Sequence, residues 1–270
     1  MHIDVFQAAI LGTIHGLTQF LPISSRAHLI LIPWLLGWPS PGLTFDIALH
    51  LGTLAALLIY FFKDWVHLTT SAFRMFKNPE DHDARLALYI ILATIPGGIA
   101  GLLFEHFEYQ VSTPTVIAVM LIAVALLMRF AEISGRRKTH LATIRLSDAM
   151  MIGFAQILAI IPGVSRTGIT ITAGLSRGMT RKAAAQFSFL LSAPIIAGAV
   201  VKTMIDIAVE GPPGQSAPLV VGIIVSAFWG VISIAGMMYY LQNRSTFIFV
   251  NYRIVLGIAV LVLGYFWGMH

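Results

Sequence analysis

The sequence contains no cysteine among its 270 residues. This absence excludes disulfide bonds, thiol nucleophiles and cysteine-ligated metal sites. Charged residues are also scarce, because Asp, Glu, Lys and Arg make up only 11% of the chain, against about 25% in a soluble domain. The residues after Met1 include no basic region and no small-residue cleavage site, so we expect no signal peptide.

Apolar sequence is abundant, with 57% hydrophobic residues. A helix that crosses a membrane needs about 20 predominantly apolar residues. Six segments satisfy this length and composition: 45–62, 86–105, 113–131, 185–208, 218–242 and 251–268. We therefore predict an all-α polytopic membrane protein that forms a single integral membrane domain over residues 1–270.

Two further apolar regions are interrupted by polar residues. Residues 5–37 are broken at 22–28, and residues 148–180 are broken at 162–172. Each break leaves two pieces that are too short or too polar for a full span. We interpret both regions as re-entrant helix–loop–helix hairpins, which are tolerated at membrane depth where protein or water surrounds the loop. The alternative is that residues 5–23 cross the membrane alone.

The positive charge of the loops predicts the orientation of the chain. Loops 63–85 and 132–146 each carry four Lys or Arg residues, whereas loops 106–112 and 209–217 carry none. Basic loops remain in the cytoplasm, so both termini should lie outside. The net charge of +5 therefore reports orientation, and we expect no nucleic acid partner. Loop 63–85 also contains aromatic residues, which predicts an interfacial amphipathic helix or, alternatively, a solvated loop.

A short motif occurs twice, once in each broken region. Residues 22–26 and 162–166 share the pattern Pro-x-x-Ser-Arg. Each half of the chain would contain one hairpin and three spans, and an odd number of spans inverts the second half relative to the first. We therefore predict an inverted-topology repeat of residues 1–135 and 145–270, with both motifs near the membrane midplane.

The residues in these breaks favour an anion site. Arg26 and Arg166 are costly at membrane depth, by about 2.5 kcal/mol or more each, so each should face a partner or a wet cavity. Guanidinium groups match phosphate oxygens bidentately, and Ser25 or His28 could attack phosphorus or move a proton. The ligand would be a lipid phosphate or a transported anion. For Thr170, the alternative is that a small residue allows close helix packing.

The same segments resemble the signatures of the bacterial undecaprenyl-diphosphate phosphatase family. Residues 15–28 (HGLTQFLPISSRAH) are similar to its first signature, and residues 162–168 (PGVSRTG) match its second. Segments 45–53 and 187–194 are similar to further family segments. The resemblance implies six spans, two re-entrant hairpins and a site that opens to the outer face of the bacterial inner membrane. It also implies hydrolysis of a polyprenyl diphosphate lipid, which recycles the carrier for cell-wall synthesis and confers bacitracin resistance.

The resemblance carries roles to individual residues. Ser25 matches the candidate nucleophile, His28 the catalytic histidine and Arg166 the diphosphate-binding arginine. The remaining residues that we expect to bind the substrate are Ser24, Arg26, Ser165, Thr167, Gly168 and Thr170.

The first signature departs from the family at two positions. His15 and Gln19 stand where the family has acidic residues implicated in metal binding and proton handling. We include both among the catalytic candidates, but a divalent cation, Mg²⁺ or Ca²⁺, would have a weakened site, because a neutral amide is a poorer ligand than a carboxylate. Asp46 is a possible metal ligand, and it lies four residues from His50, so the two should share a helix face.

Two functions from different classes stay open at this point. One is an integral membrane phosphatase that converts undecaprenyl diphosphate to the monophosphate and phosphate. The other is a non-hydrolytic polyprenyl-phosphate carrier or flippase on the same scaffold, which the loss of the acidic residues favours. The partners that we expect are the lipid substrate, the bilayer and a second copy of the chain in a homodimer.

Overall fold

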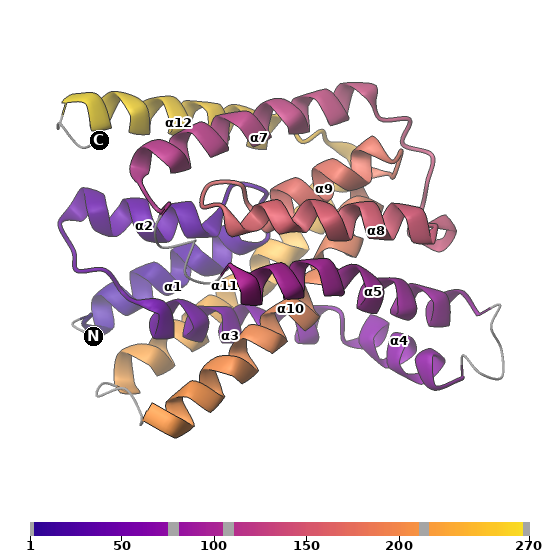
Figure 1. Cartoon of the computed structure of the whole chain (residues 1–270), viewed down its shortest axis with the longest axis horizontal. Coiled ribbons are helices and arrows are strands. Elements are labelled where there is room, and N and C mark those ends of the chain that lie inside the picture. The colour runs from indigo at the N-terminus through magenta and orange to yellow at the C-terminus, as the bar shows by residue number, and fades with distance from the viewer. Residues whose placement is uncertain (1–2, 75–80, 105–110, 211–215, 267–270) are drawn as a thin grey trace.

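A computed structural model describes residues 3–74, 81–104, 111–210 and 216–266, and within them the elements are helical (Figure 1). The α-helices are α1 (Val5–Gln19), α2 (Ser25–Leu36), α3 (Leu43–Tyr60), α4 (Phe62–Arg74), α5 (His82–Leu103), α7 (Pro114–Ser134), α8 (Leu146–Ala155), α9 (Arg166–Ser176), α10 (Arg181–Glu210), α11 (Ser216–Asn243) and α12 (Phe247–Phe266). Two 3₁₀ helices, η1 (Leu141–Thr143) and η2 (Gln156–Ile160), flank α8.

The six predicted spans are confirmed. Helices α3, α5, α7, α10, α11 and α12 are each long and apolar enough to cross a membrane. Helix α4 confirms the helix predicted inside loop 63–85. Most of the predicted loops 106–112 and 209–217 lies outside the described residues. The chain is therefore a multi-span membrane protein.

The two broken regions form short helices on either side of a turn. Helix α1 has 15 residues and α2 has 12, so each is about 18–23 Å long at 1.5 Å per residue. The hydrocarbon core is about 30 Å thick. Neither helix is long enough to cross it, which favours the re-entrant hairpin over a span at 5–23. Helices α8, η2 and α9 repeat the pattern around a second turn at 161–165.

The halves of the chain are interlocked. Helix α1 packs along α11 from the other half, and α8 packs along α5 in the reciprocal arrangement. A Cβ atom on Gly12 would lie 3.0 Å from the carbonyl oxygen of Gly222, and one on Gly153 would lie 2.6 Å from that of Ala93. Glycine at these matching places lets the helix backbones approach closely, as small residues do in membranes.

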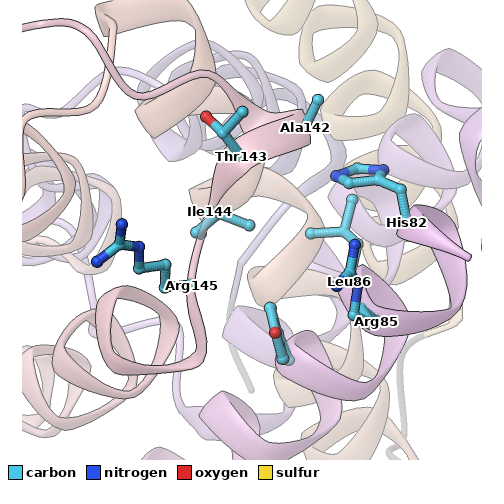
Figure 2. A pocket seen from close by; sticks show the side chains of 8 residues that line it. His82, Arg85, Leu86, Ala142, Thr143, Ile144 and Arg145 are labelled. Carbon is cyan, nitrogen blue, oxygen red and sulfur yellow. The ribbon is translucent and has the colours of Figure 1, made fainter. Parts of the chain in front are cut away.

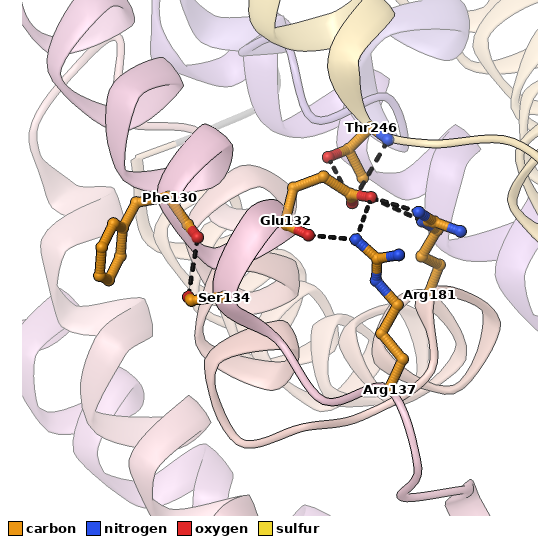
Figure 3. A network of polar contacts seen from close by, with 6 residues as sticks. All are labelled: Phe130, Glu132, Ser134, Arg137, Arg181 and Thr246. Atoms are coloured by element: carbon orange, nitrogen blue, oxygen red, sulfur yellow. Dashed lines mark hydrogen bonds and ion pairs between the residues drawn. The ribbon is translucent and has the colours of Figure 1, made fainter.

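The two ends of the bundle carry different parts of the chain. The start of α1 and the end of α12 lie at one end of the molecule, and the connection from α7 to α8 lies at the other (Figure 1). At the second end, the buried carboxylate of Glu132 accepts hydrogen bonds from Arg137 at 2.7 Å, from Arg181 and from the Thr246 hydroxyl at 2.9 Å (Figure 3). This network joins the ends of α7, α10 and α12.

Candidate functional site

The turns of the two hairpins meet inside the bundle. The Thr167 hydroxyl of α9 donates a 3.0 Å hydrogen bond to the backbone carbonyl of Gln19, at the end of α1. This contact joins residues that are 148 positions apart. The two Pro-x-x-Ser-Arg segments therefore lie close together, since Arg253 also bonds both of them, and their position near the membrane midplane stays a prediction.

Each turn ends in a serine that caps the following helix. Ser24 has φ of 74° and accepts from the Ala27 amide at 3.3 Å, while Ser165 has φ of 70° and accepts from the Gly168 amide at 3.1 Å. Positive φ is unfavourable for a residue with a side chain, at about 1–3 kcal/mol, and such strain concentrates at functional sites. Both serines predicted to bind substrate thus have hydroxyls engaged in capping.

The two copies of the motif differ by one residue in where the helix begins. Helix α2 starts at Ser25, whereas α9 starts at Arg166, one place later in the motif. The second turn accommodates an additional residue through Gly163, which has φ of 93°, a conformation that glycine adopts at little cost. As a result, Ser165 is the N-cap of α9, and its hydroxyl accepts from the helix backbone. Ser25 is the first residue of α2, and its hydroxyl does not cap that helix. The two serines that the motif aligns are therefore not equivalent.

Ser25 and Gln19 are bonded across the first turn. The Ser25 hydroxyl donates to Gln19 Oε1 at 2.6 Å. Gln19 therefore contacts both turns, through its side chain to Ser25 and through its backbone carbonyl to Thr167. A neutral amide orients the hydroxyl, but it cannot accept its proton as a carboxylate would.

His28 has partners on both sides of its ring, and in the described chain neither is Ser25. Its Nδ1 lies 2.7 Å from the carbonyl oxygen of Ser24, and its Nε2 lies 2.7 Å from the Tyr252 hydroxyl. A carbonyl oxygen only accepts, so Nδ1 carries a proton, and in the neutral ring Nε2 accepts from Tyr252. Tyr252 belongs to none of the motifs recognised in the sequence.

Arg26 and Asp46 form an ion pair, with 3.3 Å between Nη1 and Oδ2. His50 lies on the same face and contacts Asp46 through the backbone, because its Nδ1 donates to the Asp46 carbonyl oxygen at 2.8 Å. The Asp46 carboxylate is directed to Arg26. The spacing of four residues predicted that Asp46 and His50 share a helix face. It did not predict that His50 would bond the backbone carbonyl oxygen of Asp46.

His15 is fully buried against His50. The ring centroids are 4.5 Å apart in an edge-on arrangement. Neither ring nitrogen of His15 has a hydrogen-bond partner within the described residues. Buried polar atoms are normally paired, so both nitrogens are unsatisfied polar groups close to the turns.

Thr170 follows the packing alternative. Its hydroxyl lies 2.6 Å from that of Ser188 on α10 and donates to the Arg166 carbonyl oxygen at 2.7 Å. These bonds hold α9 against α10. Thr170 therefore supports the helix that carries Arg166.

The residues around the turns do not fit Mg²⁺ or Ca²⁺. These ions take oxygen ligands and prefer carboxylates. The Asp46 carboxylate pairs with Arg26, and the Gln19 oxygen accepts from Ser25. No group of three or more His, Cys, Asp or Glu side chains that could hold a metal occurs in the part of the chain that the structure describes.

Arg253 on α12 is the residue that the sequence analysis missed most clearly. It is fully buried and donates to carbonyl oxygens of both turns. Its signal was present in the sequence, because an arginine inside an apolar span marks a functional or structural site by default. The length and hydrophobicity of segment 251–268 predict a span but do not indicate what its arginine contacts.

A cavity of about 250 Å³ lies elsewhere, between the start of α5 and the segment around η1 (Figure 2). The residues that line it are His82, Arg85, Leu86, Tyr89, Ala142, Thr143, Ile144 and Arg145. None of these residues belongs to either turn. The cavity is therefore separate from the candidate site.

Comparisons with known proteins identify relatives of this chain. Residues 8–259 match the family model described as bacitracin resistance protein BacA. A protein of Geotalea daltonii named undecaprenyl-diphosphatase is 49% identical over 264 residues, covering 96% of this chain and 98% of the relative. Relatives of the same name from Pelotomaculum thermopropionicum and Geobacter sulfurreducens are 46% and 47% identical, each covering 96% of this chain and 96% and 97% of the relatives. The chain therefore belongs to the BacA family of bacitracin resistance proteins.

Proposed function

We propose that this protein is an integral membrane phosphatase that hydrolyses undecaprenyl diphosphate to undecaprenyl phosphate and phosphate. Its relatives bear the name undecaprenyl-diphosphatase. The observation that carries the proposal is the junction of the two turns, where Thr167 is bonded to Gln19 and each turn leads into a helix that begins beside an arginine. The reaction recycles the lipid carrier for cell-wall synthesis, and bacitracin resistance follows from it.

The proposed role of the two helix starts is to bind the diphosphate. The first backbone N–H groups of a helix and its dipole favour an anion. Arg166 is the first residue of α9 and Arg26 the second of α2, and both are half-buried. We assign Arg166 to the bidentate contact, while Arg26, held by Asp46, supplies positive charge.

Ser25 is the proposed nucleophile. Attack of its hydroxyl oxygen on the terminal phosphorus breaks the phosphoanhydride bond, releases the lipid monophosphate and leaves a phosphoserine that water hydrolyses. Gln19 would orient the hydroxyl. We assign the proton transfers to His28 and Tyr252, whose bonded pair lies one helical turn from Ser25. Because the donors do not fit Mg²⁺ or Ca²⁺, no step is assigned to a cation.

The orientation is part of the same proposal. The halves 1–135 and 145–270 would form an inverted repeat in the inner membrane, with the site open to the outer face. The reciprocal packing of α1 on α11 and of α8 on α5 supports the inversion. A homodimer remains a prediction, which the mass of the protein in nanodiscs would test.

Phosphate release by the purified protein tests the function. Farnesyl diphosphate and undecaprenyl diphosphate would be compared, with and without chelator, against Ser25→Ala. We expect release by the wild type and a loss of about 10² or more in kcat for Ser25→Ala. A wild type that binds polyprenyl phosphate but releases none would contradict the enzyme and support the carrier.

A further inference from the structure

We infer that Arg253 is a positioning residue that holds the two turns together, an inference that rests on the proposed function of these turns. Its Nη1 donates to the carbonyl oxygen of Pro22 at 3.0 Å, in the first turn. Its Nη2 donates to those of Gly163 at 2.8 Å and Val164 at 3.1 Å, in the second turn. One guanidinium thus bonds the backbone of both halves of the site.

The same side chain also anchors the turns to α7. Arg253 Nε donates to the carbonyl oxygen of Leu121 at 3.2 Å, and Nη2 lies 3.4 Å from that of Met120. Helices α7 and α12 pack along each other. Arg253 therefore connects the turns to a rigid helix pair, which fixes where α2 and α9 begin.

The charge of Arg253 is balanced by backbone dipoles. The residue is fully buried, and no carboxylate in the described part of the chain forms an ion pair with it. A buried cation is costly unless it is well hydrogen-bonded, and here the carbonyl oxygens of the two turns supply hydrogen bonds. A role in positioning explains why its bonds go to the turns.

Gly168 shows how closely the start of α9 approaches Arg253. A Cβ atom added to Gly168 would lie 3.0 Å from Arg253 Nη1 and 3.1 Å from Ser165 Cβ. A side chain there would have to displace the guanidinium or the capping serine. Glycine at this position therefore lets the start of α9 lie directly against Arg253.

Lysine cannot replace this arrangement. The planar guanidinium directs five N–H donors, and here they reach carbonyl oxygens of three separate segments. An ammonium is a compact charge with three donors on a flexible stem. Arg253→Lys therefore keeps the positive charge but loses the hydrogen bonds that join the two turns. Arg253→Met loses both the charge and these bonds.

Hydrogen exchange and kinetics together test the inference. Wild type, Arg253→Lys and Arg253→Met would be compared in amide exchange of segments 20–25 and 161–166 and in phosphate release. We expect faster exchange in both segments at once, and a fall of about 10² in kcat, as expected when reacting groups are misplaced by about 1 Å. KM should change less, because Arg166 is retained.

The controls separate positioning from general destabilisation. Arg244→Met removes an exposed arginine and should leave both exchange and kcat unchanged. Gly168→Ala crowds Arg253 Nη1 without removing the guanidinium. Because Nη1 bonds Pro22, this change should raise exchange in 20–25 as well as in 161–166, so it tests the inference even if Arg253→Met does not fold. Normal kcat in Arg253→Lys, or faster exchange in one segment alone, would overturn the inference. A wild type that releases no phosphate would instead overturn the proposed function, and the exchange result would still decide whether Arg253 joins the turns.

Discussion

The hydroxyl of Ser25 lies 2.6 Å from Oε1 of Gln19, and this bond connects the first residue of α2 to the last residue of α1. The geometry is that of a nucleophile and its base, but the amide cannot take a proton. This relationship gives the most direct test of how the site works.

Gln19→Glu should increase phosphate release. The two side chains have nearly the same shape, so the bond to Ser25 is kept while the acceptor becomes a base. General-base assistance contributes about 10²–10⁴ in rate, and we expect at least a tenfold gain in kcat. Dependence on added Mg²⁺ should also increase, because an anionic oxygen is a better ligand for it.

The matched control is Gln242→Glu, a change of charge at an exposed position near the end of α11. It should leave kcat unchanged. A Gln19→Glu protein that is folded but slower than wild type would mean that the neutral amide is required at this position.

Arg166→Lys should lower kcat/KM by about 10², although the charge is kept, because an ammonium cannot reproduce the bidentate contact. Arg26→Lys should cost less, since Arg26 is paired with Asp46. Steady-state kinetics of both variants, with Arg244→Lys as control, would check this. If Arg26→Lys is the more damaging change, the two arginines have the opposite roles.

Tyr252→Phe should lower kcat by about tenfold and leave KM nearly unchanged, because it removes the hydroxyl bonded to His28 Nε2 but keeps the stacked ring. His28→Ala should cost about 10² or more. Tyr265→Phe, on the same helix but exposed, is the control. Equal activity of Tyr252→Phe and wild type would exclude the hydroxyl from proton transfer.

Glu132→Gln should destabilise the protein by about 2–3 kcal/mol, because removing one partner of a buried ion pair leaves the others uncompensated. The side chains of Arg137 and Arg181 are 34% and 21% exposed. Water therefore solvates their charges in part, which makes the loss of stability smaller than for a fully buried ion pair. We expect Tm to fall by about 5–10 °C, measured in detergent. Lys138→Gln, an exposed change in the same loop, should not alter Tm, and an unchanged Tm in Glu132→Gln would contradict the role of the network.

Reporter fusions should place residue 140 and the C-terminus on opposite sides of the membrane. Loop 132–146 is basic and should be cytoplasmic, and the end of α12 lies at the other end of the bundle (Figure 1). Two fusions that report the same side would contradict the re-entrant hairpins, because the number of full crossings would then differ.

The sequence alone determined which segments are helical, because a membrane leaves few options for the backbone. Apolar stretches of about 20 residues must satisfy their own hydrogen bonds as helices. The polar breaks at 22–28 and 162–172 were recognisable because they interrupt such apolar stretches. Ser25, Arg26, His28 and Arg166 lie in or directly after these breaks, so the sequence alone singled them out as site candidates.

The tertiary structure decided which partner each of these side chains has. Ser25 is bonded to Gln19 and His28 to Tyr252, 224 residues away. No local pattern encodes a contact across that separation, because it depends on how α12 packs beside the first hairpin. Arg253 illustrates the same limit: its type is visible in the sequence, but the carbonyl groups that it bonds come together only when two halves of the chain interlock.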